Sequence, residues 1–297
     1  MIEVPHRLGL HLTPAVIKID TQKLQEAKNR LLESRYISEV ATTSQYELFR
    51  LRCEGGTIVA YTSGKIVASG QTCEALLQSM IRELDFGESE HDFIIGSDEA
   101  GKGEWLGPLV VAAVGLTPKQ SADLRAVGVM DSKGLSADRI ASLSAEIEGN
   151  CQGLYSVIVP PQTFNKRLEE FHQEGKNLND LLAWAHAKAV SEVHKQLNPS
   201  RESRVRVVVD EFSRLKTQQR FRRAIDLDTV ELIQKPRAED VVSVGAASIV
   251  ARNARDAWIG SASDRLGVDL SRLSSEDAQK RDDLSFFAKT SYLKKRL

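Results

Sequence analysis

The stretch FIIGSDEAGKGEWLGPLVVAAVGL, residues 93–116, decides the fold class of this 297-residue chain. Phe93–Asp98 is an apolar run that ends in an acid, and Leu109–Leu116 is a second, nearly continuous apolar run. Runs of this length and composition are typical of strands buried inside a sheet. Between them lies a glycine-rich turn that holds two adjacent carboxylates at its start and a lysine, Lys102.

Outward from this stretch, strands alternate with helices. The apolar runs Ser156–Val159, Val205–Val209 and Val230–Ile233 predict three more strands. Residues 178–196 and 241–258 carry helical patterns. Strands interleaved with helices indicate an α/β sheet domain.

A separate module precedes this domain, because the polar stretch Leu84–Asp92 ends one periodic pattern before the next apolar run begins. Upstream of it, the spacing predicts helices over 21–36 and 72–83, and strands over 46–53, 57–62 and 65–69. We therefore expect a small α+β domain over residues 1–88 and an α/β domain over residues 92–297.

Composition limits the classes of function. With 40 Lys+Arg, 41 Asp+Glu and a net charge of -1, the chain lacks the basic excess of proteins that hold nucleic acid by charge alone. No stretch approaches the ~20 apolar residues of a membrane span, and the start lacks a signal-peptide layout, so we expect a cytoplasmic protein without a membrane partner. Cys53, Cys73 and Cys151 form no CxxC pair, which predicts reduced thiols and no zinc knuckle.

The turn GSDEAGKGEWLGPL, Gly96–Leu109, is neither of the common phosphate loops. A Walker A loop would need a hydroxyl residue after Lys102, where Gly103 stands, and the glycine spacing does not fit a dinucleotide fingerprint. Carboxylates beside a phosphate repel it unless a divalent cation lies between them. Acids at a strand end next to a flexible turn therefore favour a metal-dependent phosphodiester site.

Such a site needs carboxylates from several elements. Asp210 ends the run RVRVVV and is followed by Glu211, and Glu239 with Asp240 precedes the helix that starts near Val241. An acid at a strand end is commonly a turn residue, and an acid before a helix is commonly a cap. Spacing alone leaves both interpretations open.

The motif Gly96–Leu109 resembles the opening motif of the type 2 ribonucleases H, and its GKG turn resembles the ribonuclease HIII branch. Further similar segments are VMDSKGL at 129–135, GKNLNDLLAWAHA at 175–187, VVVDEF at 207–212, AED at 238–240 and GAASIVAR at 245–252. Tyr61–Lys65 with Gly70 and Gln71 resembles the N-terminal module of ribonuclease HIII, whose fold is like half of the TATA-binding protein. Glu104 departs mildly from the Asp that is usual after GKG.

The resemblance implies a ribonuclease H-like mixed sheet flanked by helices, preceded by a TATA-binding-protein-like α+β domain that binds substrate. It implies an endonuclease that hydrolyses the RNA strand of RNA/DNA hybrids with two Mg²⁺ or Mn²⁺ ions and leaves 5′-phosphate and 3′-hydroxyl ends. The metal-binding catalytic acids would be Asp98, Glu99, Asp210 and Glu239, with Asp240 as the competitor for the fourth position. Gly101, Lys102 and Gly103 would contact the hybrid, and the protein is expected to act as a monomer.

Two other functions remain open. A ribonuclease HII-type enzyme would also incise at single embedded ribonucleotides, and a non-catalytic relative would bind nucleic acid without cleaving it. His186 and His194 are interpreted as packing or surface residues, and Lys289 as a weak candidate for a phosphate contact. In the N-terminal domain, Arg50, Arg52 and Lys65 lie on or beside the predicted strands that would face the hybrid.

Overall fold

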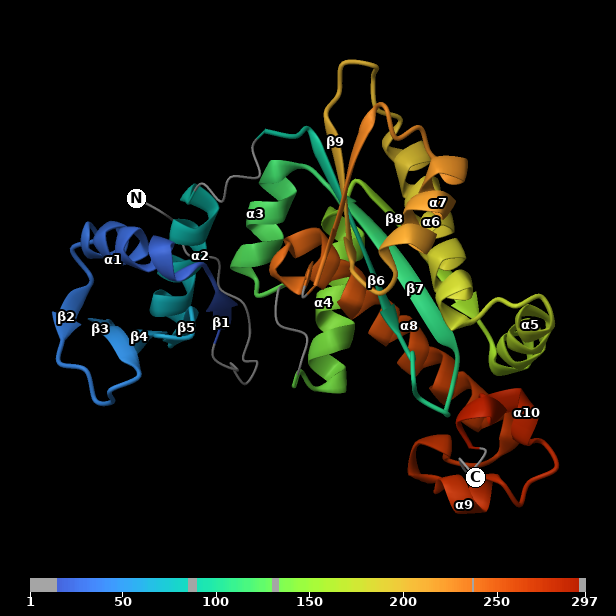
Figure 1. Cartoon of the computed structure of the whole chain (residues 1–297). Coiled ribbons are helices and arrows are strands. Elements are labelled where there is room, and N and C mark those ends of the chain that lie inside the picture. The colour runs from blue at the N-terminus through green and yellow to red at the C-terminus, as the bar shows by residue number, and fades with distance from the viewer. Residues whose placement is uncertain (1–14, 85–89, 130–133, 237, 294–297) are drawn as a thin grey trace. The chain divides into compact units, whose positions relative to one another are not determined.

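The computed structural model describes residues 15–84, 90–129, 134–236 and 238–293, without the side chains of Ala15 and Glu239 (Figure 1). The chain divides into two compact units, one that ends at Leu84 and one that follows it, with the short segment Arg125–Gly128 grouped with the first. Each unit has its own five-stranded sheet.

The N-terminal unit is an antiparallel sheet with the order β1-β5-β4-β3-β2 and two helices. Its elements are β1 Ala15–Lys18, the 3₁₀ helix η1 Thr21–Lys23, α1 Leu24–Leu32, β2 Ser38–Val40, β3 Glu47–Cys53, β4 Gly56–Tyr61, β5 Lys65–Ser69 and α2 Gln71–Glu83. The three predicted strands and both predicted helices are confirmed. The two edge strands were missed because they are only four and three residues long.

One face of this sheet is covered by helix. Phe49, Leu51 and Cys53 alternate along β3 as buried residues, and Cys53 forms a disulfide with Cys73 of α2. The expectation of reduced thiols is therefore wrong for this pair, because the fold brings the end of β3 to the start of α2. Cys151 remains a free thiol.

The second unit is a mixed sheet with the order β10-β9-β6-β7-β8, in which β10, β9 and β6 are parallel and β7 and β8 are antiparallel to their neighbours. The strands are β6 Phe93–Ala100, β7 Leu109–Leu116, β8 Gly153–Val159, β9 Val205–Asp210 and β10 Val230–Lys235. The helices are α3 Pro118–Ala126, α4 Ala137–Asn150, α5 Pro161–Gln173, α6 Leu178–Leu197, α7 Arg214–Ala224, α8 Val242–Leu266, α9 Ser275–Ala278 and α10 Leu284–Phe287, with the 3₁₀ helices η2 Ala238–Asp240, η3 Leu270–Arg272 and η4 Thr290–Tyr292. All five predicted strands and the two predicted helices are present.

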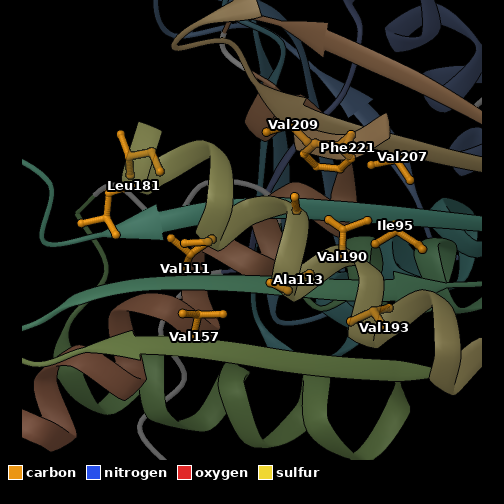
Figure 2. Packing of buried hydrophobic residues seen from close by; sticks show 14 of the residues in the cluster. Ile95, Val111, Ala113, Val157, Leu181, Val190, Val193, Val207, Val209 and Phe221 are labelled. Atoms are coloured by element: carbon orange, nitrogen blue, oxygen red, sulfur yellow. The ribbon is translucent and has the colours of Figure 1, made fainter. Parts of the chain in front are cut away.

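The two long helices cover opposite faces of this sheet. Ile95, Val207 and Val209 pack with α6 in the main core, which Figure 2 shows from close by. The alternate residues Ile94 and Val208 pack instead with Val244 of α8. This alternation fixes which face each side chain of β6 and β9 points to.

Gly96 permits the close approach of α8. A Cβ atom at this position would lie 2.2 Å from the backbone of Ser243 and Val244, so any other residue would push the helix away from β6. Neither α6 nor α8, nor any other helix within the described residues, has the length and apolarity to cross a membrane.

Candidate active site

The predicted acids Asp98 and Asp210 lie at the same level on neighbouring strands. Ser97 of β6 is in parallel register with Val209 of β9, so each acid follows that pair by one residue. Ile94 lies four residues before Asp98 and Val208 lies two residues before Asp210, and both pack with α8. The period-two alternation of a strand therefore places both acids on that face. The topology therefore brings together two carboxylates that are far apart in sequence.

Asp98 and Glu99 point to opposite faces because they are consecutive in a strand. Asp98 faces α8, where the side chain of Ser248 is its hydrogen-bond partner. Burial, together with the negative charge of Glu99, outweighs this bond and raises the pKa of Asp98 to about 6. A bound cation would relieve both of these costs.

Glu99 faces α6 and has two basic partners. Its Oε2 lies 3.1 Å from Nε2 of His186, and its Oε1 lies 3.0 Å from Nζ of Lys102. Burial opposes ionisation of this carboxyl, but the hydrogen bond and attraction from His186 and the attraction of Lys102 prevail and lower its pKa to about 2. Glu99 is thus a fully ionised carboxylate at neutral pH.

The predicted fourth acid, Glu239, belongs to η2, a segment that contacts Asp210 through its backbone. The backbone N–H of Ala238, the first residue of η2, donates to Oδ1 of Asp210 at 3.3 Å. The side chain of Glu239 lies outside the described part of the structure. Asp240 has a side chain that is 61% exposed and pairs with Lys235 at 2.7 Å.

The donor set fits a hard divalent cation by its chemistry. In the ranges 15–84, 90–129, 134–236 and 238–293, no group of three or more described His, Cys, Asp or Glu side chains forms a metal cluster. The described acids are nevertheless oxygen donors, and Asp98 carries an uncompensated burial and repulsion cost. Oxygen ligands with excess negative charge are what Mg²⁺ and Mn²⁺ require.

The glycine turn between β6 and β7 leaves backbone open to a substrate at Lys102 and Gly103, whereas Gly101 is buried. Gly101 and Gly103 have φ angles of 84° and 81°, a region that favours glycine. A Cβ atom at Gly103 would meet no atom within 4 Å, so its backbone is accessible from outside. Lys102 lies between them, with its Nζ within 5.3 Å of the centre of the Phe212 ring.

The C-terminal segment holds this turn in place. The backbone N–H of Lys289 donates to the Trp105 carbonyl at 2.7 Å. The backbone N–H of Gly107 donates to the Phe287 carbonyl at 2.9 Å. The Lys289 side chain is fully buried and its Nζ donates to the Gly107 carbonyl. The interpretation of Lys289 as a phosphate contact is therefore wrong, because its ammonium group points into the protein.

Sequence reasoning missed His186 and Ser248 as site neighbours. The interpretation of His186 as a packing residue agrees with its full burial, but the sequence does not indicate its contact with Glu99. The sequence did hold one signal for His186: it lies among the small apolar residues Ala183, Ala185 and Ala187. A polar side chain buried among such residues needs a hydrogen-bond partner. The DSK segment at 131–133 lies outside the described residues.

Comparison with known proteins gives consistent results. Residues 95–282 match the family model described as ribonuclease HII. Ribonuclease HIII of Protochlamydia amoebophila is 35% identical over 280 residues, which cover 91% of this chain and 88% of the relative. Ribonuclease HIII of Chlamydia caviae is 31% identical, covering 82% and 79% of the two chains. The solved structure of Bst-RNase HIII in complex with Mn²⁺ has a similar fold, with a TM-score of 0.59 and 24% identity over 95% of this chain and 98% of that one.

Proposed function

The chain belongs to the ribonuclease HIII branch of the type 2 ribonucleases H, and we infer that it hydrolyses the RNA strand of RNA/DNA hybrids with divalent metal ions. The observation that carries this inference is the placement of Asp98 and Asp210 at adjacent strand ends, beside a turn with accessible backbone. The products would carry 5′-phosphate and 3′-hydroxyl ends.

We assign Asp98, Glu99, Asp210 and Glu239 as the acids that hold Mg²⁺ or Mn²⁺. When bound, the metal ions would activate the attacking water and offset the charge that develops on the leaving oxygen. The ion pair of Asp240 with Lys235 supports Glu239 as the fourth acid, because it gives the Asp240 carboxylate another partner.

Substrate contact is assigned to Gly101, Lys102 and Gly103. An accessible backbone at a glycine turn suits close approach to the ribose, whose 2′-hydroxyl distinguishes RNA from DNA without sequence readout. The Lys102 ammonium lies 3.0 Å from a site carboxylate and is therefore within the region that a phosphate would approach.

A cleavage assay tests this function. We expect the purified protein to cut the RNA strand of an RNA/DNA hybrid with Mg²⁺ or Mn²⁺, and not with EDTA. A duplex with a single embedded ribonucleotide distinguishes the two branches, since the ribonuclease HIII assignment expects poor cutting there. Efficient incision at that single site would instead favour the ribonuclease HII type, and absence of cutting with either metal would leave only nucleic-acid binding.

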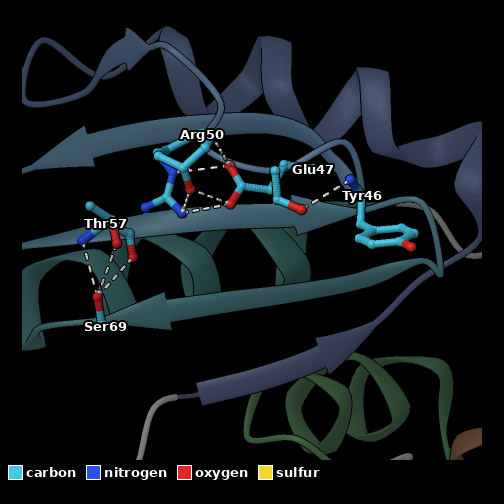
Figure 3. Close-up of polar contacts among 7 residues, drawn as sticks. Tyr46, Glu47, Arg50, Thr57 and Ser69 are labelled. Atoms are coloured by element: carbon cyan, nitrogen blue, oxygen red, sulfur yellow. Dashed lines mark hydrogen bonds and ion pairs between the residues drawn. The ribbon is translucent and has the colours of Figure 1, made fainter.

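The N-terminal domain is proposed to bind the hybrid with the sheet face opposite its helices. Arg52, Thr57 and Ser69 are in register across β3, β4 and β5 on that face, and Figure 3 shows the hydrogen bonds between Thr57 and Ser69. Arg50 is already neutralised, because its Nη2 donates to Glu47 Oε1 at 2.7 Å. Arg52 is exposed and is therefore the stronger candidate for a phosphate contact.

We further propose that the protein acts as a monomer in the cytoplasm. Size-exclusion chromatography with light scattering would test the first statement, and fractionation of cells would test the second.

A further inference from the structure

We propose that His186 is a positioning residue for Glu99, and that it fixes one carboxylate oxygen so that the other stays available to a metal ion. The proposal rests on the function inferred above. His186 touches neither the substrate turn nor Asp98 in any described hydrogen bond, so its action is exerted through Glu99.

The His186 ring is held at both nitrogens. Nε2 lies 3.1 Å from Oε2 of Glu99, and Nδ1 lies 2.8 Å from Oγ of Ser97. The Ser97 hydroxyl is also 2.8 Å from the carbonyl of Ala112 on β7. A carboxylate only accepts hydrogen bonds, so Nε2 of His186 carries the hydrogen of its bond to Glu99. This holds whether the Ser97 hydroxyl donates to Nδ1 of His186 or to the Ala112 carbonyl.

Both groups behind Glu99 are shielded from water. His186 and Ser97 are each 0% exposed. The Phe212 ring stacks on the His186 ring with centroids 5.2 Å apart and an angle of 27°. Phe212 follows Asp210 by two residues, so the stacking also ties the end of β9 to the Glu99 side of the site.

The two oxygens of Glu99 are therefore unequal. Oε2 is bound to a rigid, buried ring, whereas Oε1 contacts Lys102, a longer side chain that is 36% exposed. An exposed ammonium on a flexible stem can move away, but the buried imidazole cannot. Oε1 is thus the oxygen that this arrangement leaves for a cation.

Support of this kind has a measurable effect. Partners that hydrogen-bond metal ligands typically contribute about 10–100-fold to metal affinity or activity. Loss of the Nε2 donor should let the Glu99 carboxylate rotate, which lowers metal affinity and kcat. The KM for hybrid should change less than kcat, because the backbone of the glycine turn is held by the separate C-terminal segment.

The test compares His186→Leu and His186→Gln with the wild type, using His194→Gln on the same helix as the matched control. Mn²⁺ affinity is measured by calorimetry without substrate, and kcat and KM are measured on a hybrid. We expect His186→Leu to lose about 10–100-fold in both Mn²⁺ affinity and kcat. His186→Gln, whose amide can donate, should recover part of each, and His194→Gln should match the wild type.

Ser97→Ala guards against misfolding, since it keeps the contact of His186 with Glu99 and removes only the hydrogen bonds of the Ser97 hydroxyl with His186 and with the Ala112 carbonyl. It should shift Mn²⁺ affinity in the same direction as His186→Leu, but by less. Wild-type Mn²⁺ affinity in folded His186→Leu would overturn the proposal, as would equal losses in the Leu and Gln variants. A wild type that binds Mn²⁺ but leaves hybrids intact would refute the proposed function instead, while the Mn²⁺ comparison still tests His186.

Discussion

His186 Nε2 lies 3.1 Å from Glu99 Oε2, although 87 residues separate the two positions in the chain. This contact gives two consecutive carboxylates opposite properties. Glu99 is held ionised with a pKa of about 2, whereas burial and the charge of Glu99 raise the pKa of Asp98 to about 6. The adjacent acids of the motif therefore differ in how readily they ionise, and they point to opposite faces of the sheet.

Asp98→Asn should abolish metal-dependent hybrid cleavage and leave binding largely intact. Loss of a metal ligand removes several kcal/mol of transition-state stabilisation, which corresponds to about 10³-fold or more in kcat. Retained cleavage would contradict the site assignment.

The same variant should be more stable than the wild type when a chelator is present. The folded protein binds the Asp98 proton more tightly than the unfolded chain, so the wild type loses stability as pH rises from 3.8 to about 6. Above that range the Asn variant should gain on the order of 2 kcal/mol in free energy of unfolding. Urea denaturation at about pH 4 and about pH 7 measures the difference.

Glu239→Gln should lower kcat by about 100-fold or more, whereas Asp240→Asn should stay within about threefold of the wild type. The physical reason is that Asp240 is exposed and paired with Lys235. Hybrid cleavage at saturating Mg²⁺ measures both. The opposite ranking would assign the fourth position to Asp240.

Gly96→Ala should destabilise the catalytic domain by about 3 kcal/mol, because the added methyl group would overlap the backbone of α8. Gly149→Ala is the matched control, since a Cβ atom there meets nothing within 4 Å and the position is in helix α4. Urea denaturation should show a lower midpoint for the first variant only. If Gly96→Ala has the same urea midpoint as the wild type, then β6 and α8 can move apart without loss of stability.

Lys289 should make stability depend on pH. Burial and the nearby charge of Arg255 lower its pKa from 10.5 to about 7, so the unfolded chain binds more protons between these values. Stability from this group therefore rises with pH over that range. The free energy of unfolding of the wild type relative to Lys289→Met should increase by on the order of 2 kcal/mol from about pH 7 to about pH 9.5.

Lys280→Met serves as the control for Lys289→Met, because its exposed side chain loses the same charge. That control should show no comparable change with pH. If the difference in free energy of unfolding between the wild type and Lys289→Met also stays constant with pH, then burial of the charged Lys289 ammonium does not destabilise the folded protein.

Arg52→Ala should weaken hybrid binding about 5–10-fold at low salt and reduce the salt slope by about one ion, with kcat unchanged at saturating substrate. Arg82→Ala removes the same charge from α2, on the helical side of the domain, and should have little effect. Deletion of residues 1–88 should likewise weaken binding far more than turnover. Unchanged hybrid affinity in both Arg52→Ala and the deletion variant would reject a substrate-binding role for this domain.

Much of the fold could be predicted because its strands are apolar runs. Leu109–Leu116 is buried at every position, and its bounds follow directly from its composition. Helices such as α3, PKQSADLRA, and α7, RLKTQQRFRRA, were not predicted because their polar residues give little apolar periodicity. They are held by tertiary contacts, as Phe221 of α7 shows in the main core.

The sequence by itself determined the family and the acids at the strand ends, since motif residues and apolar periodicity are local properties. Only the tertiary structure decided that β6 lies between β7 and β9, which places Asp98 level with Asp210. It likewise decided that His186 is buried against Glu99 and that Lys289 points inward. These facts depend on strand order, burial and hydrogen bonds between distant segments, which neighbouring residues in the chain do not specify.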